Sequence, residues 1–380
     1  MRVLVLTASY GSGHNAAARA LAEAFVRAGA TARVVDHFRE LVHPRFERAT
    51  RALYYATLRH VPFAWGLAYE LADRMTSSSA LAFGMTRVGT ARLAALLDAE
   101  RPDAVVTVHA TPAVAMSTLA ALGKRVPPHT TVVTDFVAHG QWIAPDIDRY
   151  CVAASEVRHE YIARGIPGER IAVTGVPVRP EFATAIDAAA ARARLGLSAS
   201  APVVLAMAGS DGRLGRLADV VRVLARPARP LQGVVVAGRD TELAATLARH
   251  ASGTSVRVLG YTDDVPALMA AADLLVTKAG GMTVAEALAA ELPMIVFGSL
   301  PGQERRNERF ASRAGIGLVA RSRRELAATI DRALATPALL DDLRTSIRRV
   351  RRPHAARAIV AAVLDRDIAP HPADDDGTVR

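Results

Sequence analysis

A turn of two glycines between an apolar strand and a helix carries the clearest chemical signal in the sequence. The strand is expected at Asp273–Thr277, the turn contains Gly280 and Gly281, and the helix is expected to open at Thr283. Glycine lets the backbone approach a ligand with no Cβ in the way, and a helix start presents free N–H groups and the positive end of its dipole. The stretch therefore predicts a diphosphate site, with a purely structural strand–turn–helix unit as the alternative.

Glu286 has two interpretations because it follows Thr283 by three residues. The Thr-x-x-Glu pattern is that of a capping box, in which Glu286 satisfies a backbone N–H at the helix start. A carboxylate just after a phosphate-binding turn can also accept hydrogen bonds from the two hydroxyls of a ribose, as in dinucleotide sites. The sequence leaves both roles open.

A second glycine turn, near the N-terminus, contains a histidine. The strand Arg2–Thr7 leads into Gly11, Gly13 and His14, and a helix is expected over Ala16–Ala28. Open α/β sheets bind ligands at the carboxyl ends of their strands, and an imidazole there can accept a proton near neutral pH. His14 is therefore a candidate base, although capping or packing would also explain it. The turn lacks the third glycine of a dinucleotide fingerprint.

Polar side chains also follow a later strand. Asp135 and His139 come after the strand Thr130–Thr134, so they fall at the same ligand-bearing edge. Two Asp-x-Asp pairs, at 146–148 and 365–367, have a spacing that arises often by chance. No metal site is expected.

These residues need parallel sheets to position them, and the pattern of strands and helices predicts two. Short buried strands alternate with helices, which indicates right-handed crossovers and doubly wound α/β domains. Further strands are expected at Ala104–His109, Arg149–Val152, Ile171–Thr174, Pro202–Ala208, Val234–Gly238, Val256–Leu259 and Met294–Phe297.

Composition limits the class of protein. The 380 residues are 51% hydrophobic but only 5% aromatic, which fits two compact α/β domains, and the single Cys151 fits a reducing, cytoplasmic compartment. The uncharged stretch 104–123 contains Pro112 and is interpreted as a strand followed by a helix with Thr111 as N-cap, not as a membrane span. The net charge of +10 predicts anionic partners, but no nucleic-acid-binding motif is present and no nucleic acid is expected.

The segment from about 42 to 97 departs from the strand–helix alternation. It contains many of the aromatic residues interspersed with arginines, including Tyr54, Phe63, Trp65, Arg48 and Arg59. Such a helical insert can lie on anionic lipid, with arginines at the level of the headgroups and apolar side chains below them. Helices that simply cover one face of the sheet are the alternative.

The expected domain organisation follows from these elements. An N-terminal domain is predicted over 1–185 with the helical insert at 42–97, and a C-terminal domain over 195–352. A last helix is predicted at 353–367, followed by a disordered tail at 368–380.

Taken together, several stretches resemble family 28 glycosyltransferases, specifically the diacylglycerol glucosyltransferases and monogalactosyldiacylglycerol synthases. The matches occur in the family's order across about residues 1 to 365. They are Thr7–His14, Val133–Phe136 with His139 and Trp142, Val173–Pro180, Met207–Gly209, Val258–Tyr261, Thr277–Thr283 with Glu286, and Pro301–Glu304 with Asn307.

The resemblance implies a GT-B enzyme: two Rossmann-like domains facing a cleft, with a C-terminal helix that crosses back to the first. The C-terminal domain would bind the nucleotide-sugar, with Gly280, Gly281 and Thr283 at the diphosphate and Glu286 at the ribose. The match further implies that Gly209 closes the nucleotide pocket and that Tyr261 and Thr262 flank the uracil base. It also implies that three residues face the donor sugar: Gln303, Glu304 and Asn307. On the acceptor side it implies His14 as first choice of base and Asp135 as second, with Gly11, Gly13, His139 and Trp142 nearby.

The activity implied by the resemblance is inverting transfer of a hexose from UDP-glucose or UDP-galactose to diacylglycerol. Such an enzyme would need no cofactor and no metal, and would be peripheral on the inner face of the cell membrane, in contact with anionic lipids. The alternatives are N-acetylglucosaminyl transfer to a polyprenyl-linked cell-wall precursor, a UDP-sugar 2-epimerase, a nicotinamide dehydrogenase, and a non-enzymatic lipid-surface binding protein.

Overall fold

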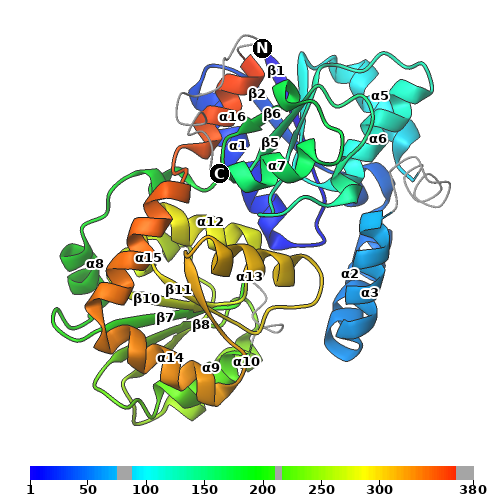
Figure 1. Cartoon of the computed structure of the whole chain (residues 1–380). Helices are drawn as coiled ribbons and strands as arrows, with labels where there is room; N and C mark the ends of the chain where they lie inside the picture. Colours follow the sequence, from blue (N-terminus) through cyan, green and yellow to red (C-terminus); the bar gives the residue numbers. More distant parts are fainter. Residues whose placement is uncertain (75–87, 210–215, 365–380) are drawn as a thin grey trace. The chain divides into compact units, whose positions relative to one another are not determined.

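The chain folds into two compact units (Figure 1). Unit 1 consists of Met1–Tyr54, Ala68–Val178 and His354–Arg380, and unit 2 consists of Tyr55–Leu67 and Arg179–Pro353. The computed structural model describes residues 1–74, 88–209 and 216–364. Part of the predicted helical insert, the turn after Gly209 and the predicted tail lie outside the described residues.

Unit 1 is built on a six-stranded parallel sheet with the order β2-β1-β3-β4-β5-β6. Because β1 and β3 are neighbours with β2 on the far side of β1, the strand order reverses between β1 and β3, where α/β sheets open a crevice for ligands. The strands are β1 (Arg2–Thr7), β2 (Thr31–Asp36), β3 (Ala104–Thr107), β4 (His129–Val132), β5 (Arg149–Val152) and β6 (Ile171–Val173).

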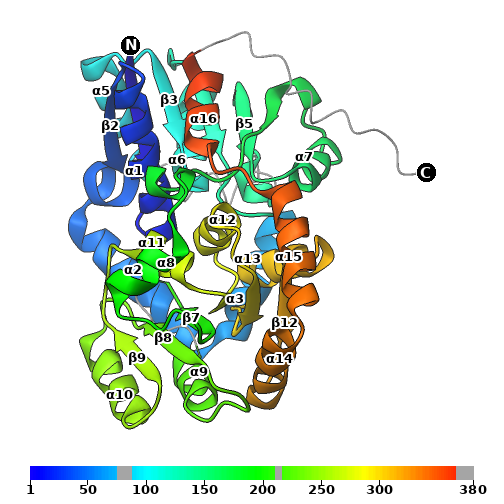
Figure 2. The ribbon, with the colours of Figure 1, turned by 90° about the vertical axis from the view of Figure 1, so that its left-hand side faces the viewer.

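Helices pack around this sheet. The C-terminal helix α16 (Ala355–Leu364) contacts α1 (Ser12–Arg27), and Figure 2 shows the two side by side. The last helix that the structure describes therefore returns to the first unit, as the family resemblance implies. The other helical elements of this part of the chain are η1 (His37–Val42), α2 (Pro44–His60), α3 (Pro62–Arg74), α5 (Thr90–Glu100), α6 (Ala110–Ala121), η2 (Gly140–Trp142), α7 (Ser155–Ile162) and η3 (Gly168–Arg170).

Unit 2 repeats the plan with the sheet order β12-β11-β10-β7-β8-β9, again entirely parallel. The order reverses between β10 and β7. The strands are β7 (Val203–Met207), β8 (Gln232–Val236), β9 (Val256–Leu259), β10 (Leu274–Thr277), β11 (Met294–Phe297) and β12 (Gly317–Ala320).

The helices of unit 2 cover both faces of its sheet, with α12 and α13 on one side and α9, α10 and α14 on the other (Figure 1). They are η4 (Pro180–Ala183), α8 (Ala188–Leu195), α9 (Leu217–Leu224), α10 (Thr241–Ala251), α11 (Val265–Ala271), α12 (Gly281–Ala289), α13 (Gln303–Arg313), α14 (Arg323–Ala335) and α15 (Pro337–Val350).

The doubly wound α/β class predicted from the sequence is confirmed in both units. Parallel strands are covered on both faces, so they are continuously apolar and easy to recognise in a sequence. The strands β3, β7, β10 and β11 are buried at every position.

Helix starts were predicted less well. The first helix begins at Ser12 instead of Ala16, which puts His14 inside its first turn. The predicted N-cap Thr111 is also wrong: α6 begins at Ala110, and the cap is His109, whose side chain accepts a hydrogen bond from the Thr111 N–H. Among the helices described, none combines the length and apolar character needed to span a bilayer.

Candidate active site

The predicted diphosphate turn lies at the carboxyl end of β10, next to the point where the sheet order of unit 2 reverses. Helix α12 begins at Gly281 and its N-cap is Gly280, with no side chain capping it. The predicted start at Thr283 is therefore two residues too late. Of the two roles left open for Glu286, the capping box is excluded, because the N-cap is Gly280 and Glu286 lies beyond the first turn. The first backbone N–H groups of α12 have no partner within the helix and can bind an anion.

The N-cap of this helix is not crowded by the described residues. A Cβ built on Gly280 would meet no described atom within 4 Å. At the end of the neighbouring strand β7, Gly209 has a φ of +81°, and a Cβ there would lie 3.7 Å from Cε of Lys278. Gly209, predicted for the donor site, thus lies beside Lys278, which itself precedes the predicted Gly280 and Gly281 in the chain.

The predicted sugar-side residues Glu304 and Asn307 hold this turn in place. The buried Glu304 carboxylate pairs with the ammonium group of Lys278 and accepts a hydrogen bond of 2.9 Å from the Leu300 N–H. The fully buried Asn307 amide donates to the Ala279 carbonyl at 3.0 Å. Both side chains therefore shape the loop that precedes α12.

Two buried oxygens in the connection from β11 to α13 lack a partner. Neither Ser299 Oγ nor Gln303 Oε1 has a hydrogen-bond partner among the residues described. An unpaired buried acceptor costs about 1–3 kcal/mol, so such groups mark positions where a ligand can supply the missing donor. Gln303 stays a predicted contact of the donor sugar.

Glu286 lies one turn into α12, and the pKa of its carboxyl is shifted by its surroundings. Burial raises the pKa of its carboxyl to about 7, although the positive charge of Arg179 acts in the opposite direction. Arg179 in turn donates to the Asp263 carbonyl at 2.8 Å. One guanidinium thus acts on the carboxyl of Glu286 and binds the loop that carries Tyr261.

Tyr261 and Thr262, the two residues predicted to flank the uracil base, lie in this loop after β9. Tyr261 is 44% exposed. The guanidinium of Arg239 lies over its ring, 3.7 Å from the centroid, and its hydroxyl donates to the Asp263 carboxylate at 2.8 Å. The Thr262 hydroxyl accepts from the Asp264 N–H at 3.0 Å, which fixes the turn into α11.

In unit 1, His14 lies where the strand order reverses between β1 and β3. Its Nδ1 is 2.8 Å from the Val108 carbonyl oxygen and 3.2 Å from the Thr134 hydroxyl. A carbonyl can only accept, so Nδ1 carries the proton, and the neutral ring has its lone pair on Nε2. Burial lowers the pKa of His14, while the nearby Asp135 carboxylate and the Val108 hydrogen bond raise it. The ring is therefore neutral at pH 7 and can accept a proton.

Aromatic rings surround the imidazole of His14. The His109 ring, from the end of β3, meets it edge to face with centroids 4.7 Å apart. The Trp142 ring lies 6.2 Å from His14 and 6.4 Å from His109. Residues predicted separately after β1 and β4 are thus brought together with a histidine that the sequence did not identify as a site.

His139, predicted on the acceptor side, is buried and bound to the backbone. Its Nδ1 accepts from the Gln141 N–H at 3.2 Å and its Nε2 donates to the Tyr69 carbonyl of α3 at 3.1 Å. Asp73 strengthens the same junction by accepting from the Gly140 N–H at 2.6 Å and pairing with Arg164 at 2.7 Å. His139 therefore supports the η2 turn that carries Trp142.

The glycines before His14 have a simpler role. Gly11 is the N-cap of α1 in an extended conformation, and a Cβ there would lie 3.7 Å from Cδ2 of His14, an ordinary contact. Gly13 lies within the first turn of the helix.

The described part of the helical insert exposes apolar side chains. No residue of α3 is buried, and its Phe63, Leu67 and Leu71 are 81%, 54% and 53% exposed. These three follow one another at four-residue intervals and so share one face of the helix. Exposed arginines accompany them on α2 and at the end of α3: Arg45, Arg48, Arg51, Arg59 and Arg74.

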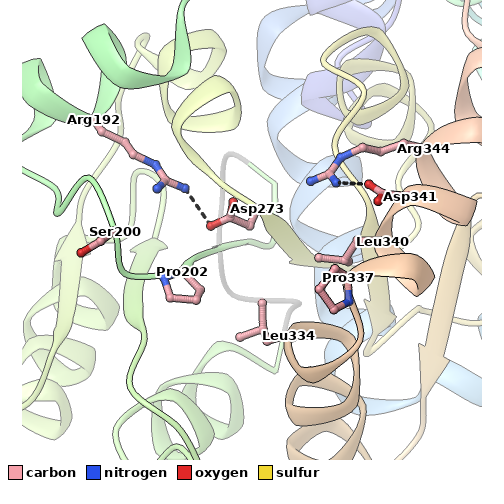
Figure 3. Close-up of a pocket in the computed structure, with 9 residues that line it drawn as sticks. All are labelled: Arg192, Ser200, Pro202, Asp273, Leu334, Pro337, Leu340, Asp341 and Arg344. Carbon is pink, nitrogen blue, oxygen red and sulfur yellow. Dashed lines mark hydrogen bonds and ion pairs between the residues drawn. The ribbon is translucent and has the colours of Figure 1, made fainter.

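A cavity of about 240 Å³ in unit 2 lies away from these residues, at the amino ends of β7 and β10 (Figure 3). Its charged side chains pair with each other, Arg192 with Asp273 and Arg344 with Asp341. The Asp273 carboxylate also accepts from the Val203 N–H. The lining is thus electrostatically balanced, and the cavity takes no part in the site described above.

The fold resembles that of several solved structures. MurG from Acinetobacter baumannii superposes with a TM-score of 0.64 at 16% identity, covering 96% of this chain and 99% of that one. A UDP-GlcNAc 2-epimerase from Neisseria meningitidis, bound to UDP-GlcNAc, gives 0.59 at 14% identity, with 96% and 100% covered. At these identities the likeness establishes the fold alone: the chain has the GT-B fold.

The sequence comparisons identify the family of glycosyltransferases to which the chain belongs. Residues 14–178 match the model of monogalactosyldiacylglycerol (MGDG) synthase, and residues 206–341 match the C-terminal domain of glycosyltransferase family 28. A processive diacylglycerol beta-glucosyltransferase from Bacillus thuringiensis is 30% identical over 96% of this chain and 94% of its own length. The chain belongs to the family 28 glycosyltransferases of the diacylglycerol glucosyltransferase and monogalactosyldiacylglycerol synthase type, as the resemblance predicted.

Sequence reasoning missed several residues that the structure brings to the site. Lys278 could have been noticed, since it is one of only two lysines in the chain and directly precedes the glycine turn. His109 follows β3 by two residues and caps α6, so it lies at the same carboxyl edge of the sheet that drew attention to His14. Arg179 and Thr134 act through contacts between residues far apart in the sequence, which spacing does not show.

Proposed function

We propose that the protein transfers a hexose from a UDP-hexose to the free hydroxyl of diacylglycerol, with inversion, at a membrane surface. The observation that carries the proposal is His14, whose Nδ1 proton is directed to the Val108 carbonyl, so that Nε2 is the basic atom. Family membership and the name of the Bacillus thuringiensis relative support the choice of donor and acceptor.

The donor's diphosphate would bind at the start of α12. Main-chain N–H groups from Gly281 onward and the adjacent Lys278 would stabilise the negative charge that develops on UDP as the anomeric bond breaks. The ribose hydroxyls would donate to Glu286, and the sugar would donate to Gln303. This arrangement needs no metal, so EDTA should leave turnover unchanged; lost activity that a divalent cation restores would contradict it.

On the acceptor side, His14 would act as general base. Its Nε2 takes the proton of the diacylglycerol hydroxyl while that oxygen attacks the anomeric carbon on the face opposite UDP. UDP-hexoses carry an α linkage, so one displacement gives a β-glycoside, which agrees with the beta-glucosyl product in the name of the relative. We therefore infer UDP-glucose as the preferred donor.

Membrane binding would come from α2 and α3. The apolar stripe of Phe63, Leu67 and Leu71 suits the acyl region just below the headgroups, and the exposed arginines suit anionic phosphates. On this proposal the protein is peripheral and its activity depends on lipid charge and salt.

One assay tests the proposal. Purified protein is mixed with diacylglycerol in vesicles that contain phosphatidylglycerol and with radiolabelled UDP-glucose or UDP-galactose, and the lipids are separated. We expect a β-glucosyl lipid, with the anomeric configuration determined by NMR. Conversion of UDP-N-acetylglucosamine without any lipid would instead indicate an epimerase, and label in a polyprenyl-linked acceptor alone would indicate a cell-wall transferase.

A further inference from the structure

Two histidines at the strand-order reversal of unit 1 use the same ring atom for their structural contacts. His14 hydrogen-bonds through Nδ1 to Val108 and Thr134, and His109 hydrogen-bonds through Nδ1 to the Thr111 N–H at 3.0 Å. The Nε2 atoms of both rings make no hydrogen bond to any residue in the described part of the chain. Both rings are half-buried, so each Nε2 can reach a ligand.

The two rings hold their protons on opposite atoms. The partner of His14 Nδ1 is a carbonyl, so that nitrogen is the protonated one and Nε2 has the lone pair. The partner of His109 Nδ1 is a backbone N–H, so that nitrogen must accept and the proton of the neutral ring is on Nε2. Burial lowers the pKa of both imidazoles, and the charge of His14 would lower that of His109 further, so both rings are neutral at pH 7.

One ring thus offers an acceptor and its neighbour a donor, with ring centroids 4.7 Å apart. A hydroxyl group has one proton to give and lone pairs to receive one, so it can bind both rings at once. The Trp142 ring, within 6.4 Å of both centroids, supplies an apolar wall beside them.

We propose that His109 is a second catalytic residue, which donates its Nε2–H to the oxygen of the acceptor hydroxyl while His14 accepts the proton of that hydroxyl. The inference rests on the proposed function and adds a residue to it. In the step, the hydroxyl O–H bond breaks and its proton moves to Nε2 of His14. The oxygen forms its bond to the anomeric carbon, and UDP leaves with the electron pair of the bond that breaks.

His109 stays neutral throughout and keeps its proton. Its donation occupies one lone pair of the oxygen and leaves another directed at the sugar, so it orients the nucleophile. Capping of α6 does not by itself explain an imidazole, because Asn, Asp and Ser are the better N-caps.

A matched pair of substitutions separates the two roles of His109. In H109N the amide oxygen takes the place of Nδ1 and can cap α6, but no donor reaches the position of Nε2. In H109Q the longer side chain places an N–H donor near the position of Nε2 and gives up the cap. Both variants are checked by thermal unfolding and by UDP-glucose binding, which should match wild type because the donor-binding residues lie in unit 2.

If His109 donates to the acceptor, H109N should keep its melting temperature yet lose about tenfold in kcat/KM for diacylglycerol, the worth of one neutral hydrogen bond. H109Q should be the more active of the two although it is the less stable. Activity that instead follows stability, with H109N near wild type, would overturn the proposal. An inactive wild type would overturn the proposed function and this inference with it, whereas an active H109N overturns the inference alone.

The tautomers can be measured without turnover. In protein carrying ¹⁵N-labelled histidine, long-range ¹H–¹⁵N spectra should show His109 protonated on Nε2 and His14 protonated on Nδ1. Adding dioctanoylglycerol should shift the His109 Nε2 resonance, and trioctanoylglycerol, which has no hydroxyl, should not. A His109 protonated on Nδ1, or equal shifts with both lipids, would refute the donor role even if neither variant were active.

Discussion

Replacing Glu286 by glutamine tests the donor site most sharply, because it removes one charge and keeps the shape of the side chain. Burial raises the pKa of the Glu286 carboxyl from 4.5 to about 7. In the folded protein at pH 8 the group is therefore ionised in surroundings that disfavour its charge. A carboxylate kept in such a place is expected to be stabilised by the ligand it binds.

The change in stability follows from the direction of this pKa shift. Between pH 4.5 and about 7 the folded protein keeps a proton on Glu286 that the unfolded chain has released. The group therefore does not change the free energy of unfolding below pH 4.5, and it lowers that free energy as the pH rises towards 7 and above. At about 1.4 kcal/mol per pH unit the full loss is about 3 kcal/mol, and roughly half of that remains after allowing for the partial exposure of the side chain. E286Q should match wild type near pH 5 and exceed its unfolding free energy at pH 8 by about 1–2 kcal/mol in urea titrations.

The affinity for UDP-glucose should change in the opposite direction to the stability: it should rise with pH in the wild type and be lower in E286Q. On the proposed donor site the ribose hydroxyls donate to the ionised carboxylate, so protonation competes with the ligand. Wild-type affinity for UDP-glucose should therefore fall about tenfold between pH 8 and pH 6. UDP-glucose is the right ligand for calorimetry, because both of its phosphates are esterified and keep their charge over this range. E286Q should bind about 10- to 100-fold more weakly at pH 8, the worth of a hydrogen bond to a charged group, and should show no such pH dependence.

A specific pair of results would refute this reasoning. Equal UDP-glucose affinities for wild type and E286Q at pH 8, with parallel pH profiles, would exclude Glu286 from the ribose site. A more stable E286Q would then show only that the carboxyl is buried, and not that it binds the ligand.

Three further perturbations test the remaining parts of the site. H14A should lower kcat by about 10²–10⁴, the usual worth of a general base, while UDP-glucose affinity stays unchanged; near-normal turnover would remove His14 from the mechanism. G280A should fold with at most about 1 kcal/mol of lost stability, yet weaken UDP-glucose binding in calorimetry, since the added methyl enters space that is open over the helix start. Unchanged affinity would mean that the diphosphate does not approach this backbone. Serine in place of the exposed apolar side chains of α3 (F63S, L67S and L71S) should reduce co-sedimentation with phosphatidylglycerol vesicles. The control is L122S, which changes a similarly exposed leucine at the C-cap of α6, and equal sedimentation of both variants would contradict docking through α3.

The sequence predicted the sheets well and the helix starts poorly, for a physical reason. Buried parallel strands such as β10 must be apolar throughout, so they are visible in one dimension. The helices α1 and α12 are capped by Gly11 and Gly280 without any side-chain hydrogen bond, so the usual signal of a Ser, Thr or Asp cap is missing. The predicted starts consequently moved to the next residues with high helix propensity or a capping pattern.

The residues of the candidate site likewise differ in how well the sequence predicts them. Residues in the turns and helix starts that follow strands, such as His14 and Gly280, can be found from the sequence because the carboxyl ends of parallel strands share one edge of the sheet. The protonation state of His14 cannot, because it depends on Val108, 94 residues away, and on Thr134, 120 residues away. The pKa of Glu286 likewise reflects burial and Arg179, neither of which a local pattern contains.

The junction between α3 and the η2 turn has a consequence for which lipids the enzyme can use. His139 and Asp73 fasten the last turns of α3 to the residues that precede Trp142, whose ring lies beside the imidazoles of His14 and His109. If α3 rests on the bilayer, the depth to which this helix inserts therefore determines how far the imidazoles of His14 and His109 lie from the acyl chains. We expect acceptors to be chosen first by how far their hydroxyl stands from the hydrocarbon, and only then by the contacts it makes.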